Sequence, residues 1–211
     1  MSHGLMPNEV AEGTRVGMAP LARGLHRVGI TANTVTVIGV LITFAGSALL
    51  AAERPLAALV VLLAGALSDT LDGQLAKAAG GGTRFGAFLD STLDRVSDAA
   101  LSCGAVALAA ARGDTLLFWS ALVGLVASYL VSYVRAKAES MGTTASVGLM
   151  PREARLTVLL VGIGVWGVLG LYHVFVAAFA VVALLSIVTL FQRIAVVARD
   201  LSKTTPKEGN R

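Results

Sequence analysis

The stretch DTLDGQLAKAAGGGTRFGAFLDSTLDRVSD, residues 69–98, places five aspartates between long apolar segments. The first two are three residues apart, and the last three follow one another at intervals of four. Residues at these spacings are neighbours on one face of a helix, so each set lines one helical face. The Gly80-Gly81-Gly82 run between the sets marks a turn. The pattern therefore predicts two antiparallel, neighbouring helices with converging carboxylates. The aspartates are Asp69, Asp72, Asp90, Asp94 and Asp98.

The composition around this stretch is that of an integral membrane protein. Of 211 residues, 55% are hydrophobic and 14% are charged, whereas soluble domains contain about 25% charged residues. Six apolar segments are near the length of about 20 residues that crosses about 30 Å of hydrocarbon. We predict an all-α fold with six transmembrane helices, near residues 35–52, 56–78, 85–111, 116–137, 156–172 and 174–197.

The segments outside the spans set the expected topology. Residues 8–29 mix apolar and charged residues, which predicts an amphipathic helix at the membrane interface. Only Arg54 and Arg112 lie on the side of the membrane opposite the termini, so the positive-inside rule places both termini in the cytoplasm. We expect one transmembrane domain over residues 1–200, a flexible tail over 201–211, no cleavable secretory leader, and a place in the plasma membrane.

The aspartates are too costly to be incidental. A carboxylate at membrane depth costs about 2.5–3.5 kcal/mol on the insertion scale. Several carboxylates together favour a bound cation, and hard oxygen ligands select Mg²⁺, Mn²⁺ or Ca²⁺ over zinc or copper, with Mg²⁺ or Mn²⁺ expected here. Two alternatives remain at this point. The aspartates could form interior salt bridges with Lys77, Arg84 and Arg95, or they could relay cations or protons in a transporter.

Two other features narrow the range of functions. The single cysteine, Cys103, excludes an internal disulfide and a multi-cysteine zinc site, and its apolar neighbours predict a buried position. The net charge of +4 comes without a basic run interleaved with aromatic residues, so we expect no nucleic-acid partner.

The spacing from Asp69 through Gly73 and Lys77 to Gly86, Asp90 and Asp94 resembles the signature of the CDP-alcohol phosphotransferase family. The chain departs from it at Lys77, where arginine is usual. The resemblance implies that two metal ions are held by Asp69, Asp72, Asp90 and Asp94. It also implies that Asp94 acts as the general base. The implied CDP-lipid contacts are Thr31, Ala32, Asn33, Thr34, Asp69, Gly73, Lys77, Thr83 and Gly86.

A second group of charges bears on the acceptor alcohol. Basic residues at the same end of the spans as the aspartates suit an acceptor with its own phosphate, because a guanidinium group matches phosphate oxygens. These residues are Arg135, Arg152, Arg155 and Arg193. Membrane anchoring is the alternative explanation for each of them.

Within the family, three segments resemble bacterial phosphatidylinositol-phosphate synthases: residues 80–87, 94–98 and 132–139. In the third segment the cations stand in the order Arg135-Ala-Lys137, the reverse of the usual order. The resemblance implies CDP-diacylglycerol as donor, inositol phosphate (1D-myo-inositol 3-phosphate) as acceptor, CMP as product, and a homodimer in the lipid membrane. Phosphatidylglycerol-phosphate synthase is the alternative within the family.

Overall fold

The described part of the chain is helical throughout. The computed structural model describes residues 8–204, and no strand occurs in that range. The helices are α1 (Asn8–Arg27), α2 (Ala32–Ala51), α3 (Pro55–Ala78), α4 (Arg84–Arg112), α5 (Thr115–Ser140), α6 (Arg152–Leu169) and α7 (Tyr172–Thr204). The last six overlap the six predicted segments. Because α7 continues to Thr204, it includes the start of the predicted tail, and residues 205–211 lie outside the described residues.

Several helix starts carry the residue types that favour them. Three N-cap side chains accept a hydrogen bond from a backbone N–H of the first turn, which satisfies one of the free donors there. These residues are Thr31 before α2, Thr83 before α4 and Asp114 before α5. Pro55 opens α3, where a missing N–H costs nothing.

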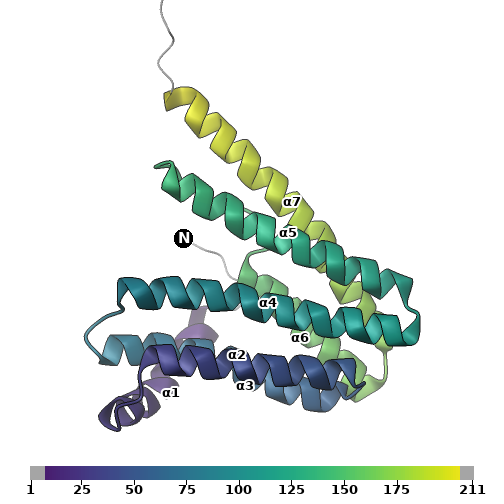
Figure 1. Cartoon of the computed structure of the whole chain (residues 1–211), viewed down its shortest axis with the longest axis horizontal. Coiled ribbons are helices and arrows are strands. Elements are labelled where there is room, and N and C mark those ends of the chain that lie inside the picture. Colours follow the sequence, from purple (N-terminus) through teal and green to yellow (C-terminus); the bar gives the residue numbers. More distant parts are fainter. Residues whose placement is uncertain (1–7, 205–211) are drawn as a thin grey trace, which may run out of the picture.

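The helices after α1 form a closed circuit (Figure 1). Helix α2 packs against α3 and α4, α4 against α5, α5 against α7, α7 against α6, and α6 against α3. The predicted antiparallel course of α3 and α4 is correct, but the prediction that they are packed neighbours is wrong. Helix α2 contacts both, because small residues bring it close to each of them.

Small residues let α2 approach both of its neighbours closely. A Cβ atom at Gly104 of α4 would lie 2.6 Å from the carbonyl oxygen of Ser47 in α2. A Cβ atom at Gly46 would lie 2.7 Å from the side chain of Leu62 in α3. Such close approach of backbones is typical of helix packing in membranes. It fixes α3 and α4 on either side of α2.

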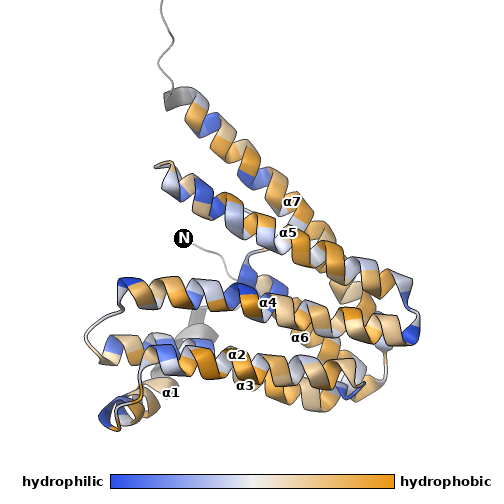
Figure 2. Ribbon diagram, in the orientation of Figure 1, coloured by the Kyte–Doolittle hydropathy of each residue, from blue (hydrophilic) through white to orange (hydrophobic). Residues whose placement is uncertain are grey.

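The surface of the helices is that of a membrane protein. Four helices, α2, α3, α5 and α7, are long and apolar enough to cross a membrane. Figure 2 shows hydrophobic residues over most of the helices, with hydrophilic positions on α4 and at the start of α6. Helices α4 and α6 are not among these four, and in α4 charged residues reach the middle of the helix, at Asp94, Arg95 and Asp98. The prediction that Cys103 is buried is wrong, because this position of α4 faces outward and is exposed.

The predicted N-terminal helix is present as α1. It packs on α3, where Ala22 of α1 forms a small apolar cluster with Val35 and Leu75. Leu21 is exposed on the same helix. The position of α1 at a membrane interface stays a prediction.

Candidate active site

The five aspartates, called here the carboxylate cluster, come from two helices on either side of α2. Asp69 and Asp72 belong to α3, and Asp90, Asp94 and Asp98 belong to α4. Asp90 lies close enough to repel three of them electrostatically, namely Asp69, Asp72 and Asp94. The structure thus brings the four predicted metal ligands into one region, as the spacing predicted, although α3 and α4 are not packed together.

Asp72 is held by a residue that the sequence did not single out. Its side chain is buried, and its Oδ2 accepts a hydrogen bond of 2.7 Å from the Thr36 hydroxyl of α2. A buried carboxylate needs such a partner. A sequence signal was available, because Thr36 is the second residue after the predicted nucleotide segment 31–34.

Arg152, at the start of α6, reaches into the carboxylate cluster. Its Nη1 lies 3.0 Å from Asp69 Oδ2 and 3.0 Å from Asp94 Oδ1, so it bridges α3 and α4. Its Nε lies 3.5 Å from Asp98 Oδ1. These contacts differ from the salt bridges considered as an alternative. Lys77 and Arg84 form no ion pair with the described side chains, and Arg95 only approaches Asp94, at 4.0 Å.

Arg155 also joins the cluster. Its Nη2 donates to Asp98 Oδ2 at 3.2 Å, and its Nη1 donates to the Met150 carbonyl oxygen at 3.1 Å. Arg152 and Arg155 are three residues apart on α6, so both point into the circuit of helices.

The cluster suits a divalent metal by its chemistry. Five carboxylates face the guanidinium groups of Arg152 and Arg155, with that of Arg95 4.0 Å from Asp94, which leaves an excess of negative charge. All of the predicted ligand atoms are hard oxygens. As the side chains stand, no three acidic, His or Cys side chains within the described residues are close enough to hold one ion. The Arg152 side chain lies between Asp69 and Asp94. A metal ion held by these two aspartates would have to take the place of Arg152 Nη1.

Several of the predicted nucleotide contacts meet at the N-terminal ends of α2 and α4. A Cβ atom at Gly86 would lie 3.2 Å from Asn33 Oδ1, so these two segments touch. Thr31 and Thr83 act as N-caps, and the hydroxyl groups of Thr31 and Thr34 lie 2.9 Å apart. Capping is thus a structural role that both threonines already have. Ala32 is the first residue of α2 and is half-buried beside them.

On α3, the space beside the predicted nucleotide residues is open. Lys77 is exposed, and nothing lies within 4 Å of a Cβ atom built at Gly73. A ligand can therefore approach the backbone closely at this glycine.

The two remaining predicted acceptor contacts do not reach the carboxylate cluster. Arg135 is exposed and pairs with Glu139 of its own helix at 2.9 Å. Arg193 is buried and donates to two backbone carbonyl oxygens, of Val147 and Val131, at 2.9 Å each. Arg193 is close enough to Arg135 and to Arg155 to be repelled electrostatically by both, so these three arginines lie near one another.

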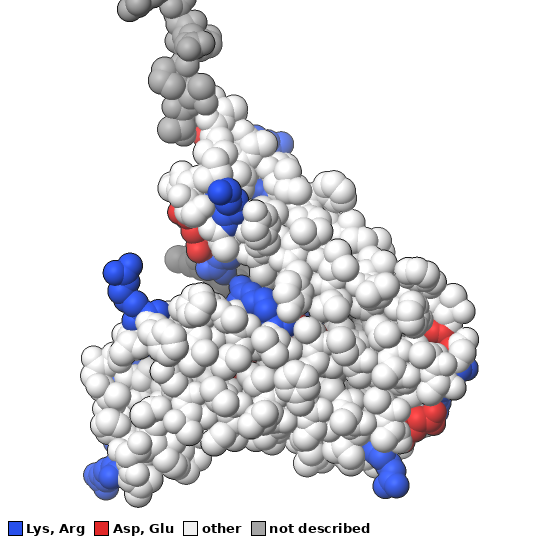
Figure 3. Space-filling model, viewed as in Figure 1, with Lys and Arg blue, Asp and Glu red and all other residues white. Residues whose placement is uncertain are grey.

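Arg193 therefore anchors the α5–α6 connection, a role that the sequence did not indicate. Thr189 contributes to the same anchor, since its hydroxyl accepts a hydrogen bond from the Met150 backbone N–H at 3.0 Å. Gly148 has a φ of +132°, and any side chain there would collide with Thr189. Figure 3 shows Lys and Arg side chains gathered around an indentation between α4 and the ends of α5 and α7.

Comparison with known proteins gives consistent matches over most of the chain. The family model for CDP-alcohol phosphatidyltransferase matches residues 29–198. A phosphatidylinositol phosphate synthase of Mycobacteroides abscessus is 41% identical over 177 residues, which cover 82% of this chain and 80% of that protein.

The fold matches solved structures as well. The crystal structure of Mycobacterium tuberculosis phosphatidylinositol phosphate synthase (PgsA1) with CDP-DAG bound is similar with a TM-score of 0.82 at 36% identity. The match covers 92% of this chain and 97% of that one. The same protein in complex with manganese and citrate gives a TM-score of 0.81 at 36% identity, with 92% of each chain covered.

Proposed function

The chain belongs to the CDP-alcohol phosphatidyltransferase family, and we propose that it is a phosphatidylinositol-phosphate synthase. It transfers the diacylglycerol phosphate of CDP-diacylglycerol to the hydroxyl of inositol phosphate and releases CMP. Membership of an enzyme family sets aside the transporter alternative. The pair Arg152 and Arg155 supports an acceptor with its own phosphate, because two guanidinium groups stand directly on the carboxylate cluster. The similarity to phosphatidylinositol phosphate synthases supports inositol phosphate over glycerol 3-phosphate as that acceptor.

The enzyme uses a divalent metal, Mg²⁺ or Mn²⁺, and we propose two ions per site. Asp69, Asp72, Asp90 and Asp94 would hold them, with Thr36 fixing one oxygen of Asp72. A bound divalent cation neutralises the negative charge of a diphosphate and of its transition state. The manganese complex of the similar PgsA1 structure supports a metal of this class.

The chain's own residues supply the remaining chemistry. Asp94 accepts the proton of the acceptor hydroxyl. The hydroxyl oxygen forms a bond to the phosphorus next to the diacylglycerol, and the bond from that phosphorus to the oxygen bridging the two phosphates breaks. CMP leaves with that bond's electron pair.

Substrate binding is divided between the two sides of the cluster. We propose that the CDP-lipid contacts are Thr31, Ala32, Asn33, Thr34, Asp69, Gly73, Lys77, Thr83 and Gly86. Most of these residues belong to the meeting point of α2, α3 and α4. The proposed acceptor-phosphate contacts are Arg135, Arg152, Arg155 and Arg193. Of these, Arg193 has two of its three nitrogens engaged with backbone carbonyl groups, so Nη2 is the atom left for a phosphate.

The arrangement in the membrane follows from the same proposal. All six helices from α2 to α7 span the plasma membrane as one domain, and α1 lies at its interface. Charges on α4 and α6 do not oppose this assignment, because several of them face the interior of the helix circuit. Both termini and the active site face the cytoplasm, and two copies form a homodimer.

An acceptor panel tests the proposed function. Purified protein with CDP-diacylglycerol and Mg²⁺ is offered inositol phosphate, inositol, glycerol 3-phosphate or serine, and CMP release is measured. We expect release with inositol phosphate. Release with glycerol 3-phosphate alone would instead identify a phosphatidylglycerol-phosphate synthase, and release only with unphosphorylated alcohols would contradict the role of the arginines.

A further inference from the structure

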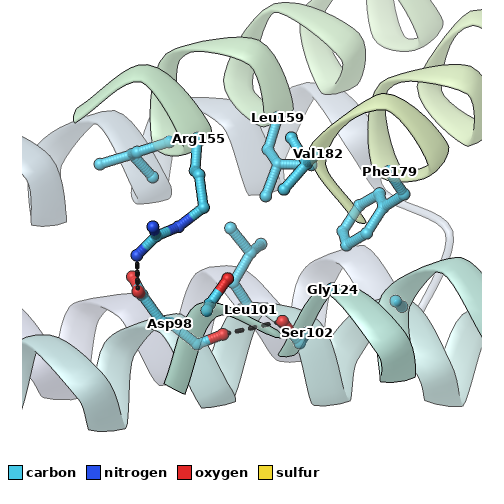
Figure 4. Close-up of a pocket in the computed structure, with 11 residues that line it drawn as sticks. Asp98, Leu101, Ser102, Gly124, Arg155, Leu159, Phe179 and Val182 are labelled. Carbon is cyan, nitrogen blue, oxygen red and sulfur yellow. Dashed lines mark hydrogen bonds and ion pairs between the residues drawn. The ribbon is translucent and has the colours of Figure 1, made fainter. Parts of the chain in front are cut away.

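Asp98 lies between two small cavities inside the circuit of helices. One cavity is bounded by Arg155, Ser128 and Phe179, from α6, α5 and α7 (Figure 4). The other is bounded by Asp69, Arg152 and Thr43, from α3, α6 and α2. Asp98 lines both. It is thus the member of the carboxylate cluster placed where the metal side and the arginine side meet.

The two oxygens of Asp98 serve two different arginines. Oδ2 accepts from Arg155 Nη2 at 3.2 Å, which Figure 4 shows as a dashed line, and Oδ1 lies 3.5 Å from Arg152 Nε. Arg155 is only 5% exposed. Its one ion pair with a described side chain is the pair with Asp98. A buried cation needs such a partner, so Asp98 fixes where Arg155 stands.

Asp98 also forms an ion pair with Arg152, at a different nitrogen from the other aspartates. Asp69 and Asp94 both contact Nη1 of Arg152, whereas Asp98 faces Nε. That Nε is buried and has no hydrogen-bond partner among the described residues. When Asp69 and Asp94 are engaged with a cation, Arg152 loses the acceptors of Nη1 but keeps Asp98 beside Nε. Its terminal nitrogens are then free for another anion while the side chain stays in place.

We propose that Asp98 is a positioning residue for the acceptor substrate: it orients Arg152 and Arg155 toward the phosphate of the acceptor and takes no part in holding metal. This inference rests on the proposed function. It divides the carboxylate cluster by role, with four aspartates for metal and catalysis and one for the arginines. Exchange of Asp98 should therefore change the Michaelis constant, KM, for the phosphorylated acceptor and leave donor and metal binding alone.

The test compares Asp98→Asn with wild type in the CMP-release assay. We expect KM for inositol phosphate to rise about tenfold or more, because both arginines lose the negative charge beside them and one of the two oxygens becomes an NH2 donor. We expect KM for CDP-diacylglycerol, and Mn²⁺ binding followed by the paramagnetic resonance of free Mn²⁺, to change less than about twofold. Glu53→Gln is the matched control, since it neutralises the partner of another arginine, Arg112, far from the cluster, and should leave every constant unchanged.

A combined variant shows whether Asp98 acts through the arginines. In an Arg152→Lys/Arg155→Lys background, Asp98→Asn should add little to the increase in acceptor KM, because the side chains that it positions are already altered. Full additivity would mean that Asp98 acts on the acceptor by another route, and it would overturn the proposal.

Three outcomes overturn the inference while leaving the proposed function standing. Mn²⁺ binding weakened about tenfold or more by Asp98→Asn would show that Asp98 serves the metal site, as a ligand or by orienting one. An unchanged acceptor KM in a folded Asp98→Asn protein would remove the positioning role. If Asp98→Asn does not fold, Asp98→Glu carries the test, because it keeps the charge and displaces the carboxylate by one methylene. Its acceptor KM must rise at least threefold, and an unchanged value overturns the proposal. Wild-type protein that is inactive with every acceptor refutes the proposed function instead.

Discussion

Two charged regions lie at different ends of the helices, and they use arginine differently. At the end of α4, Arg112 donates two hydrogen bonds to Glu53, of 2.9 Å and 2.6 Å, so each carboxylate oxygen has its own N–H donor. Arg112 also stacks on Tyr172, and Tyr172 donates to Asp114. With Trp166, these residues form the Arg112 network. In the carboxylate cluster, a single nitrogen of Arg152 is shared by Asp69 and Asp94.

The difference teaches how to tell a structural ion pair from a functional one in this chain. In the Arg112 network each carboxylate has donors of its own, since Glu53 accepts from Arg112, and Asp114 accepts from Tyr172 and from the first turn of α5. The hydrogen bonds that Arg112 donates to Glu53 lower the pKa of Glu53 below its ordinary value, so the pair stays ionised at neutral pH. The stability that it contributes is lost only as the pH falls through that lowered pKa. The carboxylate cluster has more acids than bases, and such an excess is useful only where a cation or substrate compensates it.

The largest expected effect concerns the carboxylate cluster, the functional region of the two. Asp94→Asn removes the proposed general base, and we expect the turnover number to fall about 10²- to 10⁴-fold. The variant also removes a carboxylate from a repelling group, so the thermal unfolding midpoint should not decrease. CMP release and thermal unfolding measured on the same preparation check both statements. An active Asp94→Asn enzyme would assign the proton transfer to another residue.

The next largest effect concerns the Arg112 network, the structural region. Trp166 is buried and contacts Arg112, Tyr172 and Phe175. Trp166→Ala should lower the free energy of unfolding by about 3–5 kcal/mol. The protein that remains folded should keep wild-type KM values. Denaturation in mixed detergent measures the first quantity, and a changed KM would show that the two regions are coupled.

A smaller effect sharpens the metal assignment. Thr36→Val removes the hydrogen bond to Asp72, and we expect the Mn²⁺ concentration for half-maximal activity to rise about 10- to 100-fold, as for other residues that orient metal ligands. Thr43→Val is the matched control. Thr43 is on the same helix, but its hydroxyl bonds only to its own backbone, at Gly39 O. Equal metal dependence in the two variants would contradict the role of Thr36.

The smallest effect concerns one hydrogen bond of the Arg112 network. Tyr172→Phe removes the donor to Asp114 and keeps the ring under Arg112. We expect a loss of about 0.5–1.5 kcal/mol in the free energy of unfolding. Activity should stay at the wild-type level. A larger loss would mean that the network is cooperative rather than a set of separate contacts.

The sequence was sufficient for some parts of the molecule because the relevant information is local. Spacing along α3 and α4 predicted which aspartates share a face, and they do gather in one region. The number of helices was likewise readable from apolar segments. The family signature then predicted the chemistry from Asp69 to Asp94, a stretch in which the gaps are fixed by the turns of two helices.

Other parts depend on contacts between distant residues, and these were missed. The separation of α3 and α4 follows from Gly46 and Gly104, which let α2 lie closely against both helices. The pairing of Arg155 with Asp98 spans 57 residues along the chain, and a long flexible side chain carries no spacing signal. Arg193 was predicted to meet a phosphate because it is a buried cation. Its use of backbone carbonyl groups depends on the loop at Val147.

The outward position of Cys103 makes the unmodified protein suitable for spectroscopic labelling. It is the sole thiol of the chain and is exposed on α4, five residues after Asp98. One nitroxide per chain can be attached without first removing other cysteines. Because a single chain then holds a single unpaired spin, any dipolar coupling must arise between two copies. Pulsed electron–electron resonance in lipid nanodiscs would therefore measure the spacing of α4 across a dimer, and the absence of coupling would indicate a monomer.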